Sequence, residues 1–76
     1  MKNLLECKFN REYVVKEIDK SLPLKVRRRL LELGFTRGTL VTLVRASSLK
    51  KAYLITLRGY TLSLRAHLAR AVMIDD

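Results

Sequence analysis

The chain has 76 residues, of which 49% are hydrophobic and 30% charged, and this composition predicts one folded domain over residues 1–76 and excludes disorder. Sixteen Lys and Arg against seven Asp and Glu give a net charge of +9, which favours anionic partners and disfavours a free cation. A single Cys excludes an internal disulfide, and no apolar run approaches the roughly 20 residues that span a bilayer, so we expect a cytoplasmic protein.

The N-terminal third of the chain contains signals for one strand and one helix. MKNLLECKFN, at the start, has too few apolar residues for a signal peptide. Residues 13–18 are β-branched and aromatic enough to predict a first strand. A helix over about residues 22–33 follows, with Ser21 or Leu22 as its cap and Pro23 in its first turn, where a missing N–H costs nothing.

This helix has an apolar stripe and a clear end. Val26, Leu30 and Leu33 recur at i, i+4 and i+7, with Leu31 beside them, so the stripe is expected to face the core. Gly34 stands where a left-handed C-terminal cap is needed, a conformation that glycine adopts without a Cβ penalty. The helix therefore ends at Gly34.

Two strands and a hairpin come next. Residues 36–38 form a tight turn that ends at Gly38, and residues 39–45 form the second strand. A polar tip over residues 46–51 leads to a third strand over residues 52–58, in which apolar side chains alternate between two faces.

The last part of the chain predicts short elements. Gly59 lies in a turn before a very short fourth strand over residues 61–63, and Ser63 is expected to cap a short helix near residues 64–70. Residues 72–74 form a closing strand. About five short strands with one inserted helix indicate a mainly β fold, a small SH3-like β-barrel.

Residue types that carry metal or acid–base chemistry are scarce. Cys7 and His67 are the soft ligands, and a structural transition-metal site usually needs three or four ligands at short spacings. The acids Glu12, Glu17 and Asp19 are close in sequence, but Glu12 and Glu17 alternate to opposite faces of an ideal strand. We therefore expect no tightly bound cofactor, and the metal ligands stay unknown.

Catalysis is not indicated. His67 has Ser63 at i−4, but no carboxylate is placed to orient its imidazole, and the isolated glycines form no phosphate-binding loop. Helix position explains both residues. We therefore predict that the protein is not an enzyme.

The excess of basic residues has two interpretations, a docking patch or a solvated face that keeps a small protein soluble. RNA binding by a basic barrel is the alternative function, although the few aromatic residues do not interleave with the basic runs, so nucleic acid is not the favoured partner. Most of the excess is carried by Arg27, Arg28, Arg29, Arg37, Lys50, Lys51, Arg58, Arg65 and Arg70.

The order of these elements resembles that of the ferrous iron transport protein A family, FeoA. A leucine-rich helix ends in Leu-Gly, a Gly precedes a strand, and a later Gly precedes a short leucine–arginine element and a closing apolar strand. The resemblance covers roughly residues 4 to 75. The matching positions are Leu30, Leu33, Gly34, Gly38, Gly59, Leu62, Leu64, Arg65, Ala69 or Ala71, and Ile74.

Two positions depart from the family pattern. Asn10 stands where family members commonly have a Gly before the first strand, and Asn is the next most tolerant residue of positive φ. The hairpin tip carries residues 47–51, SSLKK, where the family often has Gly and Pro. A contact made by this tip would therefore be basic.

The resemblance implies a cytoplasmic, non-enzymatic SH3-like accessory protein of bacterial ferrous iron uptake. It would dock on or regulate the membrane transporter FeoB, which carries a cytoplasmic GTPase domain, and would lie at the inner face of the membrane. The resemblance also leaves open weak binding of Fe²⁺ or another transition metal ion, including a metal-sensing role.

One candidate contact surface follows from the residues. Leu49 at the polar hairpin tip and Tyr60 beside Gly59 are the apolar residues that we expect to be exposed. If both lie on one side of the barrel with Arg37 and Arg58, they form the aromatic–arginine patch that interfaces favour. We therefore predict partner contacts at Arg37, Leu49, Arg58 and Tyr60.

Overall fold

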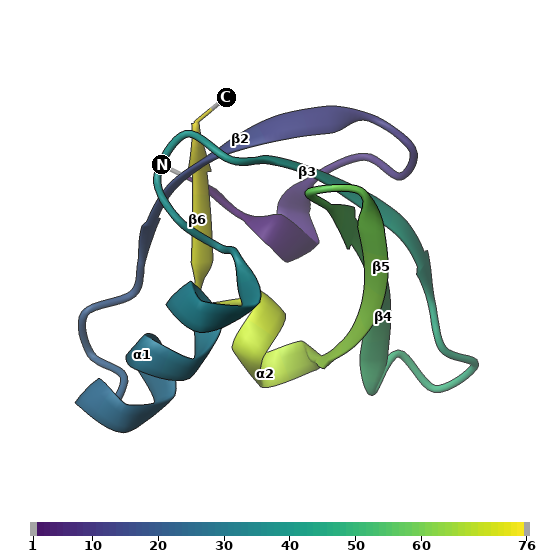
Figure 1. Ribbon diagram of the computed structural model, residues 1–76. Coiled ribbons are helices and arrows are strands. Elements are labelled where there is room, and N and C mark those ends of the chain that lie inside the picture. Colours follow the sequence, from purple (N-terminus) through teal and green to yellow (C-terminus); the bar gives the residue numbers. More distant parts are fainter. Residues whose placement is uncertain (1, 76) are drawn as a thin grey trace.

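A single antiparallel sheet of six strands forms the body of the molecule in the computed structural model, which describes residues 2–75 (Figure 1). The strands lie in the order β1-β6-β2-β3-β4-β5, and every neighbouring pair is antiparallel. In chain order the elements are β1 (Lys2–Asn3), η1 (Leu4–Glu6), β2 (Glu12–Ile18), α1 (Leu24–Leu33), β3 (Leu40–Ala46), β4 (Ala52–Leu57), β5 (Tyr60–Arg65), α2 (Ala66–Ala69) and β6 (Val72–Asp75). The mainly β, SH3-like fold class is confirmed.

One strand more is present than the sequence predicts. β1 has two residues, which pair with Ile74 and Met73 of β6, and it runs into the 3-10 turn η1. Asn3 and Glu6 form a reciprocal capping box at this turn, Asn3 accepting from the Leu5 N–H and Glu6 from the Asn3 N–H. Two residues are too few to show a period, so the sequence pattern missed β1.

The start of α1 differs from the prediction. The helix begins at Leu24, and Pro23 occupies the N-cap position itself with no side-chain cap. Ser21 is not the cap, because its N–H and its hydroxyl both donate to Asp19 Oδ1 at 2.9 Å. The local Asx turn at Asp19 thus ends β2 and precedes the helix.

The second short helix also differs from the prediction. Ser63 does not cap it, because Ser63 lies within β5 opposite Leu54. Strand pairing continues to Arg65, and the Ala66 N–H still donates to the Lys51 carbonyl at 2.9 Å. The residues that were expected to begin the helix therefore belong to β5 and pair with β4, and α2 is one turn long.

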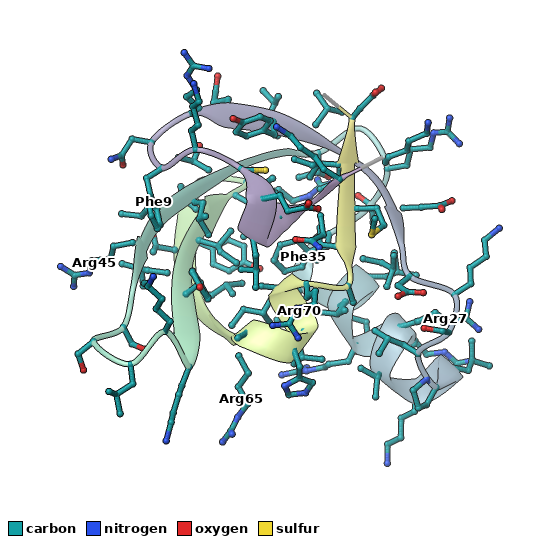
Figure 2. The ribbon with its side chains drawn as sticks, turned by 180° about the vertical axis from the view of Figure 1, so that it is seen from behind. Phe9, Arg27, Phe35, Arg45, Arg65 and Arg70 are labelled. Atoms are coloured by element: carbon teal, nitrogen blue, oxygen red, sulfur yellow. The ribbon has the colours of Figure 1, made fainter. Side chains whose placement is uncertain are left out.

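The core lies between the curved sheet and the two helices, which sit together at one end of it (Figure 1). Phe35, directly after α1, is fully buried and lies in the middle of the molecule (Figure 2). Leu30 is buried and Leu33 packs against the core, as the stripe predicts, but Leu31 is 45% exposed and faces away from it. The largest fully buried side chains are Phe35, Leu4, Leu30, Leu43, Ile55, Leu57, Ile74, Val15, Val41 and Val72.

No helix within residues 2–75 is long and apolar enough to cross a membrane, since α1, the longest, has ten residues.

Candidate functional site

The turn between β4 and β5 consists of two residues in an unusual conformation. Arg58 and Gly59 have φ values of 47° and 81°, both in the left-handed region, as type I′ hairpin turns require. Gly59 adopts this conformation freely, whereas a left-handed arginine is strained unless its surroundings hold it. The contacts of the Arg58 side chain are therefore of interest.

The side chain of Arg58 reaches from this turn to the C-terminal end of α1. Its Nε–H donates to the Gly34 carbonyl at 3.4 Å. Its Nη2 donates to the hydroxyls of Thr36 and Thr39, at 2.8 and 3.0 Å. These two hydroxyls also share a hydrogen bond of 2.9 Å, so one network joins the turn after α1 to the turn before β5.

The partners of Arg58 in this network are all neutral oxygens. Among the described residues, Thr39 is the buried one with a polar side chain, and 8% of its surface is exposed. Its hydroxyl has hydrogen-bond partners in Thr36 and Arg58. Nη1, the other terminal nitrogen of Arg58, makes no hydrogen bond within residues 2–75. The guanidinium is thus oriented by the fold while its charge keeps the capacity to pair with a carboxylate.

Tyr60, the first residue of β5, ties the same two regions together. Its hydroxyl donates to the Leu33 carbonyl at the end of α1, and 41% of the residue is exposed. The last carbonyls of a helix lack partners within the helix. Here the Tyr60 hydroxyl donates to the carbonyl of Leu33, and Arg58 donates to that of Gly34. Both residues were predicted from the sequence as contacts for a partner, and both bind within the chain.

Arg37 and Arg58 line one open depression. Its wall is formed by the turn before β3 and the turn before β5, and its volume is about 560 Å³. Glu12 also lines the depression, so its lining carries both signs of charge. The structure therefore brings together Arg37 and Arg58, with Tyr60 on the adjoining strand.

Leu49 lies elsewhere. It is 72% exposed in the loop between β3 and β4, which is the end of β4 opposite to the turn at Gly59. Hairpin turns at the two ends of one strand are separated by the length of that strand, here six residues. The four predicted contact residues thus do not form one patch, and the three that cluster are Arg37, Arg58 and Tyr60.

The three glycines predicted at turns and caps all have positive φ. Gly34 ends α1 at φ 114°, and its N–H bonds to the Leu31 carbonyl at 3.0 Å. Gly38 and Gly59 have φ values of 90° and 81° in the turns that flank the depression. Asn10 takes φ 61° before β2, as the sequence suggests for a residue in place of Gly.

The candidate metal ligands do not converge. Within residues 2–75 no group of three or more His, Cys, Asp or Glu side chains could hold a metal ion. Cys7 is buried beside η1, with Sγ 3.7 Å from the Asn3 carbonyl, while His67 lies on α2 beside α1. Asp19 is engaged with Ser21, whose N–H and hydroxyl lower the pKa of its carboxyl. The residues present therefore do not form a resident metal site.

Two further surfaces on α1 were not identified from the sequence. On one side an apolar groove between α1 and α2 is lined by Leu22, Val26 and Leu68, with Lys25 and Arg29 at its rim. The sequence predicts Val26 on the inward stripe of its helix and Leu22 as a cap, whereas the groove depends on how the two helices pack.

On the other side of α1, the exposed side chains of Leu24 and Leu31 face β2. Arg27 and Arg28 lie between these two leucines along the helix and line the same surface. The three consecutive arginines 27–29 are thus divided between the two sides, and Figure 2 shows Arg27 at the flank of α1. The leucines at i and i+7 were the available sequence signal for this surface.

The family model described as the FeoA domain matches residues 2–76. A zinc complex of FeoA from Stenotrophomonas maltophilia is similar to this chain, with 26% identity, 99% of this chain and 91% of that one covered, and a TM-score of 0.85. That protein is described as a prokaryotic SH3 domain protein with a suggested role as a ferrous iron transport activating factor. No curated protein sequence matches the chain.

Two further solved structures support the same likeness. A FeoA-like protein from Clostridium acetobutylicum has 28% identity and a TM-score of 0.84, with 99% of this chain and 87% of that one covered. FeoA from Chlorobium tepidum has 28% identity and a TM-score of 0.82, with 97% and 68% covered. A manganese-dependent transcriptional repressor with bound manganese shares the fold, at 16% identity and a TM-score of 0.85, over 35% of its length.

Proposed function

The chain belongs to the FeoA family of small accessory proteins associated with ferrous iron transport, and from that premise we propose that it docks on a FeoB-type transporter. The docking contact is made with the cytoplasmic GTPase domain of the transporter, so the protein acts on the cytoplasmic side. Docking biases the transporter between two conformations through unequal affinity for them. The protein itself is not an enzyme.

The observation that supports this proposal is the arrangement of Arg58 beside Arg37. Arg58 is held in place by Gly34, Thr36 and Thr39, so little side-chain entropy is lost when a partner binds it. Its free Nη1 and the exposed Arg37 present two positive charges to one depression. Acidic side chains on a partner would complement this surface.

The basic surface adds a second attraction. A protein with a net charge of +9 is drawn to the anionic inner leaflet beside the transporter, at about 1 kcal/mol for each Lys or Arg near the surface. This attraction holds the protein peripherally at the inner face of the membrane.

Binding of the isolated cytoplasmic domain of FeoB tests the proposal. The variant Arg37→Glu is expected to weaken the complex about tenfold, since it reverses a charge at the contact. Arg45→Glu is the matched control, because Arg45 is exposed on β3 and does not line the depression. Loss of affinity in both variants, or in neither, would remove the assignment of the contact to Arg37.

Metal binding by the chain is proposed at most as weak association with Fe²⁺. One FeoA structure contains zinc, but residues 2–75 here hold no cluster of three ligands. Titration with Fe²⁺, followed through amide chemical shifts, tests this association, and the absence of a localised change near Cys7, His67 or the acidic residues overturns it.

RNA binding remains the alternative that the net charge favours. Among the described aromatic residues, Phe9 and Tyr60 are the exposed ones, and Tyr60 is occupied at its hydroxyl by Leu33. An RNA oligonucleotide titrated at two salt concentrations separates the two functions. We expect binding that vanishes with salt, and saturable binding of micromolar affinity at physiological salt would favour RNA instead.

A further inference from the structure

The strand β5 forms one edge of the sheet. The strand order places β1 at one edge and β5 at the other. β1 has two residues, whereas β5 has six, from Tyr60 to Arg65, and Figure 1 shows it running beside β4 into α2. The long edge of the sheet is thus the outer side of β5.

The register of the hairpin determines which groups lie on that side. Two residues connect β4 to β5, so the flanking pair Leu57 and Tyr60 exchanges hydrogen bonds. Bonded pairs recur at every second residue in an antiparallel ladder, and the Ala66 N–H to Lys51 carbonyl bond of 2.9 Å at the other end has the same parity. Even-numbered residues of β5 therefore bond to β4.

The odd-numbered residues point their backbone groups outward. These are Thr61 and Ser63 in the middle of the strand, and both residues are exposed. Within residues 2–75, the outward N–H and C=O groups of Thr61 and Ser63 have no backbone or side-chain partner. Leu62 and Leu64, in contrast, bond to β4 and turn their side chains toward the core.

This edge lacks the features that usually protect a free strand. Natural edges are blunted by central charges, prolines, bulges or short length. The β4–β5 register is continuous, whereas β2 and β3 each take part in a register shift, and β5 contains no proline. Its one charged residue is Arg65, the last. The edge is therefore competent to receive a further strand.

We propose that an extended segment of the transporter's cytoplasmic domain adds to the sheet along β5, by antiparallel or parallel pairing with Thr61 and Ser63. This inference rests on the proposed function and adds the edge of β5 to the contact proposed at Arg37 and Arg58. Main-chain hydrogen bonds supply the affinity in this mode of recognition, and alternate side chains supply the specificity.

Charge selects the occupant. Two copies of this chain would bring together two net charges of +9, which opposes pairing of β5 with itself. Arg65 projects from the end of β5 away from the fold (Figure 2), and exposed Lys51 lies opposite the start of α2. An acidic residue at the corresponding end of the incoming segment complements both.

Amide hydrogen exchange, measured residue by residue by NMR, tests the inference. In the free protein the amides of Thr61 and Ser63 are expected to exchange quickly, and those of Leu62 and Leu64 slowly. Addition of the FeoB cytoplasmic domain is expected to slow exchange at Thr61 and Ser63 about tenfold or more, because each gains a backbone partner.

A matched pair of variants adds an independent measurement. Ser63→Pro removes the outward N–H and leaves the ladder to β4 intact, since proline is tolerated on the solvent side of an edge strand. Ser63→Ala keeps the N–H. We expect Ser63→Pro to weaken binding of the FeoB domain about tenfold and Ser63→Ala to bind like the unsubstituted protein. If Ser63→Pro does not fold, the exchange measurement on the unsubstituted chain decides.

Each outcome has one meaning. A domain that binds while Thr61 and Ser63 still exchange quickly overturns this inference and leaves the proposed function standing. A domain that does not bind overturns both. Protection of Thr61 and Ser63 that rises with the concentration of the protein alone identifies a second copy as the occupant and also overturns the inference.

Discussion

The side chain of Arg58 lies against the backbone of Gly34, and the two residues constrain each other. Arg58 Nε donates to the Gly34 carbonyl at 3.4 Å, and a Cβ on Gly34 would lie 3.1 Å from Arg58 Cδ and 3.2 Å from Leu57 Cδ1. Glycine is therefore needed at this position for its left-handed φ and also for the close approach of the β4–β5 turn to the end of α1.

Replacement of Gly34 by alanine tests both requirements. Gly34→Ala is expected to lower the free energy of unfolding by about 2 kcal/mol or more, because conformational strain and crowding add. Gly38→Ala is the control, since Gly38 also has positive φ but a Cβ there would meet nothing within 4 Å. It is expected to lose only about 1 kcal/mol in urea unfolding. Equal losses would show that Arg58 moves aside without cost.

Thr39 is expected to matter for stability through its hydroxyl. Thr39→Val keeps the shape of the side chain but leaves Thr36 and Arg58 without one shared partner, which costs about 1–2 kcal/mol. Thr42→Val, at a threonine on β3 three residues further on and outside this network, serves as the control and is expected to be nearly neutral. Chemical unfolding of both variants measures the difference, and equal stability would exclude a role for the network.

The hydroxyl of Tyr60 is expected to hold the end of α1. Tyr60→Phe removes its hydrogen bond to the Leu33 carbonyl and should cost about 1 kcal/mol, which shifts the midpoint of thermal unfolding by about 4–8 °C in a chain of this size. Tyr53→Phe, at a half-buried tyrosine on β4 outside the network, is the control. Amide exchange in the last turn of α1 should quicken in Tyr60→Phe alone, and unchanged exchange there would contradict the assignment.

The stability of the turn after β2 is expected to depend on acid pH. The Ser21 N–H and hydroxyl favour ionised Asp19 and hold its pKa below the ordinary value in the folded protein. The stabilising contribution is therefore present above the unfolded-state pKa of about 4 and is lost as the pH falls through the lower folded-state pKa.

Asp19→Asn is expected to show a weaker loss of stability between about pH 5 and pH 2 than the unsubstituted protein. Glu32→Gln on α1, which changes a carboxylate outside the described hydrogen bonds, is the control. Urea unfolding at several pH values measures the effect, and parallel pH profiles for the unsubstituted protein and Asp19→Asn would show that the turn contributes nothing.

Most element positions follow from local patterns. The helix that stops at Gly34 and the strands on either side of the β3–β4 loop are found within one or two residues of their predicted bounds. Some local expectations were wrong, among them the cap of α1 at Ser21, whose N–H and hydroxyl bind Asp19 instead. Ser63 was assigned to a cap because serine favours that role, yet its place in a ladder with Leu54 prevailed. Leu31 was added to the core stripe, yet it is 45% exposed on the side of α1 that faces β2.

The candidate contact residues show what a local reading misses. Arg58 and Tyr60 were selected as exposed groups near a glycine, but their side chains bind carbonyls 24 and 27 residues earlier in the chain. Leu49 was grouped with them, although the length of β4 separates it from both. Contacts over such separations depend on how the strands pair, which residue type and spacing do not specify.

The amino-acid sequence by itself determined the alternation of short strands, the end of α1 and the strong positive charge, since these depend on backbone preferences, periodicity and composition. The tertiary structure alone decided that the β4–β5 turn caps the helix, that Arg37 and Arg58 share a depression, and that β5 lies at an open edge. Such features arise when distant segments pair, and the free energy of that pairing depends on the whole sheet.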